Sequence, residues 1–300
     1  MQQAGSPGPT GSVPVLVRIR ALYPELRPSE QRIADLFLQQ PGETAEMPVS
    51  ELAQRCSTST TSVIRFCKRL GFEHVRELRN QVLRDVARER FDTAALPEVS
   101  GDIDRNDTLA DIVAKVSLAE TLSIGDTAKV LDTRALKRSV EAIASASRVD
   151  IFGVGASAIV GLDLQRKLTR IGRTALEWSD PHAAWTSAAT LQPGNVAVAV
   201  SHSGATTDTI EFLMLARRGG ATTIAITNHA GAPLADQADI VLTTAARETG
   251  FRSGALGSRI AQLMVVDCIF IGVAQSNYDR SMAALRDTYA AVHHVRAGGA

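Results

Sequence analysis

From Arg148 onward the sequence alternates short apolar runs with longer segments of helical periodicity. This alternation predicts an α/β fold, because parallel strands are joined by crossing helices and are buried on both faces. The expected strands are 149–154, 175–178, 196–200, 222–227 and 239–243. The expected helices after them are 157–170, 182–191, 208–218, 233–237 and 254–275. We therefore expect a five-stranded parallel sheet flanked by helices in this part of the chain.

The third expected strand ends in a cluster of hydroxyl and glycine residues, within NVAVAVSHSGATTD at 195–208. The hydroxyl groups belong to Ser201, Ser203, Thr206 and Thr207. Gly204 permits a tight turn between them. The N-terminus of the helix that follows attracts an anion. An ordinary strand-to-helix turn needs only one hydroxyl as a cap, so this cluster favours an anion-binding site.

A second loop, at 153–157, follows the first expected strand. Ligands of such sheets lie beyond the carboxyl ends of the strands, which is where both loops fall. The segment GVGASA at 153–158 also fits the dinucleotide-binding pattern G-x-G-x-x-A, with Glu177 in place of the ribose-binding acid. Dinucleotide binding is therefore an alternative, although it leaves the loop at 201–207 without a role.

The first third of the chain has an all-helical pattern. Helices are expected at 13–22, 30–40, 51–55, 60–70 and 74–90, with Ser29 capping the second, Ser50 the third and Ser59 the fourth. Two short helices joined by a brief turn, as at 51–70, are typical of the helix-turn-helix, whose second helix enters the DNA major groove. The apolar set of this second helix, expected in the core, is Val63, Ile64, Phe66, Cys67 and Leu70.

The candidates for DNA contact are the polar residues at the start and on the other side of that helix. They are Ser59, Thr60, Thr61, Ser62, Arg65, Lys68 and Arg69. Arg65 and Arg69 are four residues apart and share a face. A solvated basic face in a small bundle is the alternative. The whole chain has zero net charge, but residues 57–90 carry 8 basic and 4 acidic residues, and this local excess favours contact with phosphates.

The remaining features set the organisation of the chain. We expect a disordered polar tail at 1–12, a DNA-binding domain at 13–90, a linker at 91–107 and a ligand-binding domain at 108–293. Helices at 108–122 and 134–145 would pack beside the sheet, with Ile112, Val113, Val116 and Leu118 inside. The three cysteines lack metal-ligand spacing, and their odd number argues against a disulfide framework.

We expect no metal, no cofactor, no signal peptide, no apolar run of membrane-spanning length and a cytoplasmic location.

Longer motifs identify a family. The segments SEQRIADLFLQQPGETAEMPVSELAQRC and SVIRFCKRLGF resemble the N-terminal domain of RpiR-type bacterial transcriptional regulators. The segments IFGVGASAIVGLDLQRKLTRIG, AVSHSGATTDTIEFLMLARRGGATTIAITN and ETGFRSGALGSRIAQLMVVD resemble their sugar isomerase (SIS) domain. Together these similarities cover about residues 13–280.

The resemblance implies a homodimeric or homotetrameric regulator that binds a double-stranded DNA operator and, in its SIS domain, a phosphorylated sugar. The family's first ligand loop matches Gly153, Gly155 and Ser157, its second matches Ser201, Ser203, Gly204 and Thr206, and its polar position near the cleft matches Glu248. Arg65 and Lys68 match the basic positions of the recognition helix. The chain departs from the family at Ser57 and Thr58, where glycine and an aliphatic residue are usual.

SIS folds also serve sugar-phosphate isomerases and lyases, so an enzyme is the alternative function. Isomerisation needs a general base near the sugar, and Glu248, His182, His202 and His229 are the possible suppliers. A DNA-binding domain on the same chain makes sensing the simpler role, since a fold does not by itself imply a function.

Overall fold

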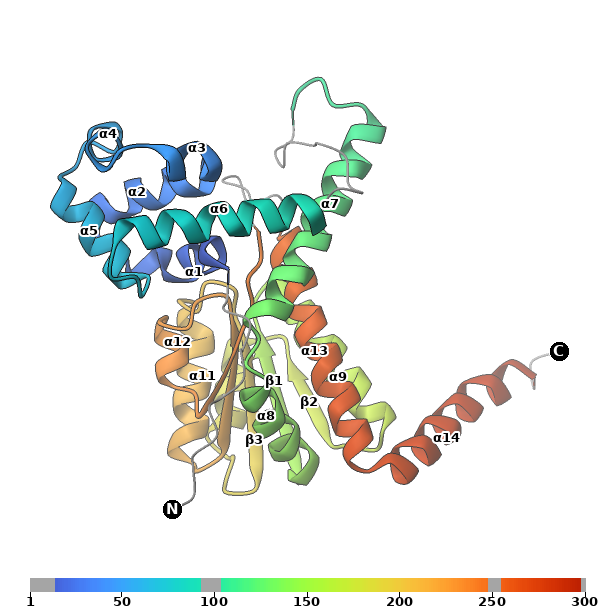
Figure 1. Ribbon diagram of the computed structural model, residues 1–300. Helices are drawn as coiled ribbons and strands as arrows, with labels where there is room; N and C mark the ends of the chain where they lie inside the picture. Colours follow the sequence, from blue (N-terminus) through green and yellow to red (C-terminus); the bar gives the residue numbers. More distant parts are fainter. Residues whose placement is uncertain (1–13, 93–103, 248–254, 298–300) are drawn as a thin grey trace, which may run out of the picture. The chain divides into compact units, whose positions relative to one another are not determined.

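The computed structural model describes residues 14–92, 104–247 and 255–297. The chain divides into two compact units, residues 1–98 and 99–300 (Figure 1). The expected tail at 1–12 and most of the expected linker lie outside the described residues.

The first unit is helical. Its elements are α1 (Val15–Leu22), the 3-10 turn η1 (Tyr23–Glu25), α2 (Pro28–Gln39), α3 (Pro41–Glu46), α4 (Val49–Arg55), α5 (Thr60–Arg69) and α6 (Val75–Asp92). One apolar core joins them, in which the fully buried rings of Phe37 and Phe66 stack with centroids 6.0 Å apart. Contact of α5 with α2, α4 and α6 fixes the helix-turn-helix on this core.

Three helix starts in this unit differ from the sequence-based expectation, and each has a proline at or directly before its first residue. A proline at the first helical position loses no hydrogen bond. Accordingly α2 begins at Pro28, so the prediction that Ser29 caps it is wrong, and α3, which was not expected, begins at Pro41 where a helix was expected to stop. The helix α4 begins at Val49 with Pro48 as its N-cap residue, so the prediction that Ser50 caps this helix is wrong.

The second unit contains a five-stranded, wholly parallel sheet in the order β2-β1-β3-β4-β5. The strands are β1 (Arg148–Gly153), β2 (Ala175–Trp178), β3 (Asn195–Val200), β4 (Thr222–Thr227) and β5 (Ile240–Thr243). Every residue of β3 is buried, as expected for a strand covered on both faces. The predicted parallel α/β sheet is therefore confirmed.

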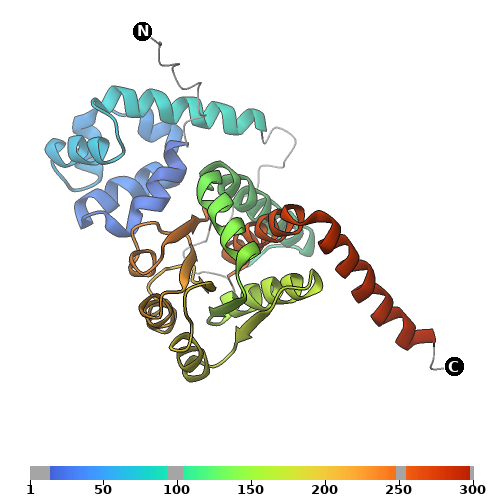
Figure 2. The same ribbon diagram turned by 90° about the horizontal axis from the view of Figure 1, so that it is seen from below.

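Helices cover both faces of this sheet (Figure 2). They are α7 (Leu109–Val130), α8 (Thr133–Ser145), α9 (Ala156–Arg170), α10 (Pro181–Ala188), α11 (Thr207–Arg218), α12 (Pro233–Asp236), α13 (Leu256–Ser276) and α14 (Tyr278–Ala297). The valines of β3 pack with α8, α9 and α13. Its alanines pack with α10, α11 and α12 on the opposite face. Consequently α9 and α11, which follow β1 and β3, lie on different sides of the sheet.

The helix α7 is longer than expected, and its first turns are not interior. Ile112 is 37% exposed and Val113 is 68% exposed, so the prediction that both are buried is wrong. Val116 and Leu118 are half-buried. In Figure 1 the N-terminal end of α7 extends beyond the sheet, which explains the exposure of these two residues.

The helix α13 is long and apolar enough to cross a membrane by length and composition alone, although no such run was expected. Its packing gives it another role. Val265, Val266 and Ile269 are fully buried in the core on one face of the sheet. In the part of the chain that the structure describes, α13 is thus a core helix of the second unit.

Candidate functional site

The site lies where the order of the sheet reverses. The chain passes from β1 outward to β2 and then returns to β3 on the other side of β1. Because α9 and α11 leave these neighbouring strands toward opposite faces, the carboxyl ends of β1 and β3 form a topological switch point, the position at which open α/β sheets bind ligands. The loops at 153–157 and 201–207 flank this position, as predicted.

Ser201 is the central residue of the second loop. It is 4% exposed, and its Oγ lies 3.0 Å from Thr206 Oγ1. The same Oγ accepts the backbone N–H of Gly204 at 3.2 Å. Ser203 lies outside this cluster, on the exposed side of the loop, where its Oγ accepts the N–H of Ala205 at 3.3 Å.

Gly204 cannot be replaced without moving the loop. Its φ is +62°, a left-handed conformation that favours glycine. A Cβ at this position would lie 2.5 Å from Ala232 Cβ and 2.8 Å from Thr227 Oγ1. The Gly204 carbonyl also accepts the N–H of Leu234 at 2.9 Å. The loop is therefore held closely against the end of β4 and the start of α12.

The N-terminus of α11 is available to an anion. Thr206 is its N-cap residue, but among the described residues its hydroxyl makes no capping bond to the helix and instead meets Ser201. Thr207, the first helical residue, is exposed. An uncapped helix start with hydroxyl groups beside it presents N–H donors and a positive end of the helix dipole to one place.

The first loop brings backbone close to the same edge. A Cβ on Gly153 would lie 2.7 Å from the Ser157 carbonyl oxygen, so the chain folds onto itself there. Gly155, the N-cap residue of α9, has φ +62° and ψ −124° and open space around its Cβ position. Ser157 is 8% exposed, and its hydroxyl points to the side-chain oxygen of Gln262 at 3.4 Å.

Gln262 is a site residue that sequence reasoning missed. It lies on α13 at 1% exposure, and its side-chain nitrogen has no hydrogen-bond partner among the described residues. A buried amide without a partner is costly, which suggests a role beside Ser157. The signal in the sequence was a single glutamine within the apolar run IAQLMVV.

The segment after β5 leads toward Glu248, which lies outside the described residues together with 249–254. This segment is fixed by α7. Thr127 Oγ1 accepts the N–H of Ala245 and Ser123 Oγ accepts that of Arg247, both at 3.1 Å. The Arg247 guanidinium pairs with the buried Asp126 at 2.7 Å. The helix α7, which follows the expected linker, thus contacts residues 245–247, the segment that leads toward Glu248.

The structure also shows where the residues lie on which the two alternative functions, an isomerase or lyase and a dinucleotide-binding protein, would depend. The rings of His202 and His229 meet edge to face with centroids 5.8 Å apart, beyond the ends of β3 and β4, whereas His182 packs on Trp185. Glu177, the proposed ribose acid, has its Cγ 3.7 Å from the Cβ position of Gly161 on α9. Burial raises the pKa of its carboxyl group. The Glu177 side chain is thus half-buried, with its aliphatic part against α9.

The turn between α4 and α5 forms despite its unusual sequence. Ser57 adopts the left-handed conformation with φ +47°, which costs a non-glycine residue about 1 kcal/mol. Arg32 of α2 stabilises the turn, because its guanidinium donates to the carbonyls of Cys56 at 2.8 Å and Ser57 at 3.0 Å. Ser59 then caps α5 by accepting the N–H of Ser62 at 3.2 Å, as expected.

The DNA-contact candidates do not all share one surface. Thr60, Thr61, Arg65, Lys68 and Arg69 are exposed. Ser62 is 7% exposed and bonds Ser59, so it belongs to the cap. Ile64 is 44% exposed, and the prediction that it is buried is wrong.

A buried carboxylate lies under the basic side chains of α5. Glu30 is 2% exposed and bonds the backbone N–H of Arg27 at 3.0 Å. Its other partners are Arg69 Nη1 at 3.1 Å and Arg65 Nε at 3.8 Å. Arg69 also donates to the Glu25 carbonyl at 2.9 Å. These bonds hold the Arg69 side chain on the domain and restrain that of Arg65. The Lys68 side chain is exposed.

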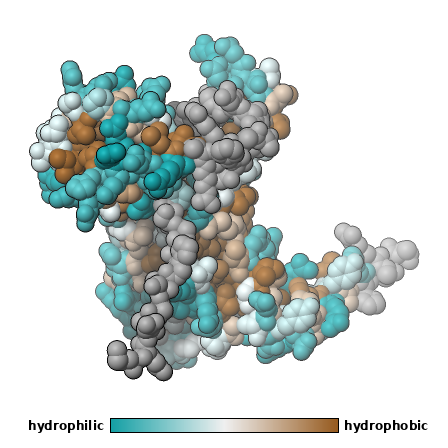
Figure 3. Space-filling model, viewed as in Figure 1, coloured by the Kyte–Doolittle hydropathy of each residue, from teal (hydrophilic) through white to brown (hydrophobic). Residues whose placement is uncertain are grey.

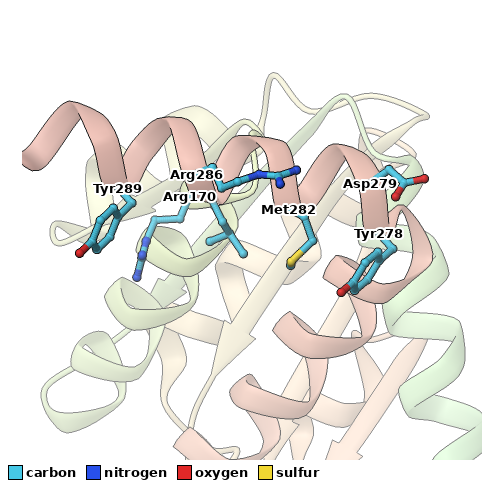
Figure 4. A pocket seen from close by; sticks show the side chains of 7 residues that line it. Arg170, Tyr278, Asp279, Met282, Arg286 and Tyr289 are labelled. Carbon is cyan, nitrogen blue, oxygen red and sulfur yellow. The ribbon is translucent and has the colours of Figure 1, made fainter.

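An open groove of about 830 Å³ lies away from the sheet edge, between the end of α9 and α14. Figure 4 shows Tyr278, Met282 and Tyr289 on the side of α14 that faces Arg170. Tyr278 and Tyr289 are each 62% exposed. The groove is thus a partly apolar helix face, distinct from the polar loops described above.

Comparison with known proteins agrees with this architecture. Residues 13–89 match the helix-turn-helix domain of the rpiR family, and residues 142–272 match the SIS domain. An HTH-type transcriptional regulator of Caldanaerobacter subterraneus is 37% identical over 91% of this chain and 95% of its own length. The chain belongs to the RpiR family. The YbbH regulator of Bacillus subtilis, another relative, is 32% identical over 94% of this chain and 98% of its own.

A solved structure matches both domains of this RpiR-family chain. The Vibrio vulnificus NanR protein complexed with ManNAc-6P is 27% identical, covers 94% of this chain and 98% of its own, and superposes with a TM-score of 0.59. The recognised family and fold are therefore confirmed: an N-terminal helix-turn-helix domain and a C-terminal SIS domain.

Proposed function

We propose that this chain is a sequence-specific transcriptional regulator of carbohydrate metabolism that binds a phosphorylated sugar in its SIS domain and an operator through α5. One observation carries the proposal. The hydroxyl loop at 201–207 meets the uncapped start of α11 at the reversal point of the sheet, on a chain that also has a helix-turn-helix. That the NanR protein is complexed with ManNAc-6P supports the same class of ligand here.

The phosphate would lie on the N-terminus of α11, with hydrogen bonds from the hydroxyls of Ser201, Ser203, Thr206 and Thr207. The sugar would extend toward Ser157, and Glu248 would bind one of its hydroxyls. Gly153, Gly155 and Gly204 would shape the backbone around it. The loop at 201–207 contains no acidic residue, and the first one after it is Asp208. The local charge therefore suits an anion.

A titration of the operator complex tests this function. A sugar phosphate changes operator affinity only if it binds the DNA-competent and DNA-incompetent arrangements unequally. We expect one member of a panel of hexose and amino-sugar phosphates to change operator affinity by about fivefold or more. Either direction supports the proposal, since the regulator can repress or activate. A panel without any effect on operator affinity contradicts it.

The alternative is an isomerase or lyase, and the adjacent His202 and His229 are the observation that favours it. The same panel of sugar phosphates, incubated with the protein and separated by chromatography, distinguishes the two functions. We expect no conversion, because sensing requires only binding. Turnover at enzymatic rates would establish the alternative.

We further propose that the chain works as a homodimer or homotetramer in the cytoplasm. Brown and teal surface alternate along α14 in Figure 3, and its exposed Tyr278, Tyr289 and Val292 offer an apolar face for a second copy. Asp279 and Arg286 on the same helix provide opposite charges for a two-fold interface. Two DNA-binding domains could then reach half-sites one or more helical turns apart. A monomer mass by light scattering would contradict this assembly.

A further inference from the structure

The exposed face of α5 carries an aliphatic side chain, Ile64, among polar and charged neighbours. The core side of the helix is complete without it, since Val63 and Phe66 are fully buried whereas Ile64 is 44% exposed. Residues three and four positions apart share a helix face. Ile64 therefore lies in line with Thr61 and Lys68, which are both exposed.

The side chain next to Ile64 is held in place. Arg65 Nη2 lies 3.5 Å from Ser62 Oγ, and Arg65 Nε lies 3.8 Å from the buried carboxylate of Glu30. A restrained guanidinium suits bidentate contact with the O6 and N7 atoms of guanine. Ile64 has no polar group, so it can add to recognition only through an apolar contact.

The major groove offers one apolar group to such a side chain, the C5-methyl of thymine. We propose that Ile64 contacts a thymine methyl group in each operator half-site, beside the base pair read by Arg65. This inference rests on the proposed function, because it requires α5 to enter the major groove. It specifies the partner further: a half-site in which a thymine lies next to a guanine-containing base pair.

The test replaces the thymine methyl and the isoleucine in turn. A DNA site selected from a random library by the wild-type protein is synthesised with each thymine changed singly to deoxyuridine, which removes only the methyl group. Affinities are measured by fluorescence anisotropy for the wild type, Ile64→Ala and the conservative variant Ile64→Val. Thermal unfolding of each variant verifies that the domain is folded, which we expect because Ile64 lies outside the core.

At one thymine position per half-site, we expect deoxyuridine to weaken wild-type binding about threefold to tenfold, the range that burial of a methyl group allows. Ile64→Ala should bind the unmodified site with a similar loss and show no further loss with deoxyuridine at that position. Ile64→Val should retain most of the sensitivity to deoxyuridine. Such a pattern would establish the contact, because the two losses are not additive.

Two results would overturn the inference and are distinguishable. Suppose that Arg65→Ala weakens binding to the selected site, but that Ile64→Ala leaves the effect of deoxyuridine unchanged at every thymine position. The thymine contact is then wrong, while the DNA-reading role of α5 stands. If the wild type selects no DNA sequence, the proposed function fails and this contact fails with it.

Discussion

Alanine at both Arg65 and Lys68 is expected to lower operator affinity by at least about 100-fold. Arg65 would contact a base edge, where a bidentate pair contributes about 1–3 kcal/mol of discrimination. Lys68 would contact a phosphate and release a counterion from the DNA. Because an operator with two half-sites binds two copies of α5, each substitution removes its contact in both half-sites. A mobility-shift assay at fixed salt concentration measures the effect.

The matched control is the double variant Arg134→Ala with Lys137→Ala, which removes two basic side chains from the exposed surface of α8. Operator affinity should stay within about twofold of the wild type, because scattered surface charges act weakly through salt-screened fields. The single variants separate the roles. Arg65→Ala should flatten the sequence preference, whereas Lys68→Ala should weaken binding to all sequences and lower the salt dependence. Near-wild-type affinity of the double variant at 65 and 68 would contradict the assignment of α5 as the reading helix.

Ser201→Ala is expected to weaken sugar-phosphate binding by about 10-fold to 100-fold and to leave operator affinity unchanged. Hydrogen bonds to a charged group contribute about 1.5–3 kcal/mol, and each 1.4 kcal/mol corresponds to about tenfold in affinity. The variant also removes the hydroxyl that meets Thr206 Oγ1 and accepts the Gly204 N–H. Isothermal titration calorimetry with the sugar phosphate measures the loss.

Ser145→Ala is the matched control for this variant. Ser145 is an exposed serine at the end of α8, and among the described residues its hydroxyl bonds only carbonyls of its own helix. It should bind the sugar phosphate as the wild type does. Equal affinity of Ser201→Ala and Ser145→Ala would show that the loop at 201–207 does not hold the phosphate.

The sheet could be predicted from the sequence because strands buried on both faces leave a clear pattern. Alternation of valine and alanine in β3 reflects one face that packs on α9 and α13 and another that packs closely on α11. The boundaries agree with the expectation to within one or two residues. The position of both candidate ligand loops could be predicted from the strand boundaries, since the carboxyl ends of parallel strands all lie at the same edge of the sheet.

The sequence did not show in the same way which side of α5 is buried and which is exposed. Successive residues of a helix are turned by about 100°, so Ser62 and Ile64 flank the core-facing Val63 symmetrically. Periodicity cannot say which flank is covered. The structure covers Ser62, whose hydroxyl meets Ser59, and exposes Ile64. Hydrophobicity alone favoured the opposite assignment.

Contacts between distant parts of the sequence were also beyond prediction. Gln262 lies 105 residues from Ser157, and only the packing of α13 beside α9 brings them together. Arg69 looked like a DNA contact because it shares a face with Arg65. Its guanidinium also bonds the Glu30 carboxylate and the Glu25 carbonyl, 39 and 44 residues earlier in the chain, and nothing in the sequence indicates these bonds.

The central claim is that a doubly charged phosphate ester binds beyond the carboxyl ends of β1 and β3, at the N-terminus of α11. Calorimetric titration of the wild-type protein with the sugar phosphate that alters operator binding, and with the same sugar lacking its phosphate, tests this most directly. The account predicts saturable binding of the phosphorylated sugar and at least about 100-fold weaker binding of the parent sugar, because the helix N-terminus and hydroxyls act on the phosphate. Equal affinity for the two sugars would contradict it.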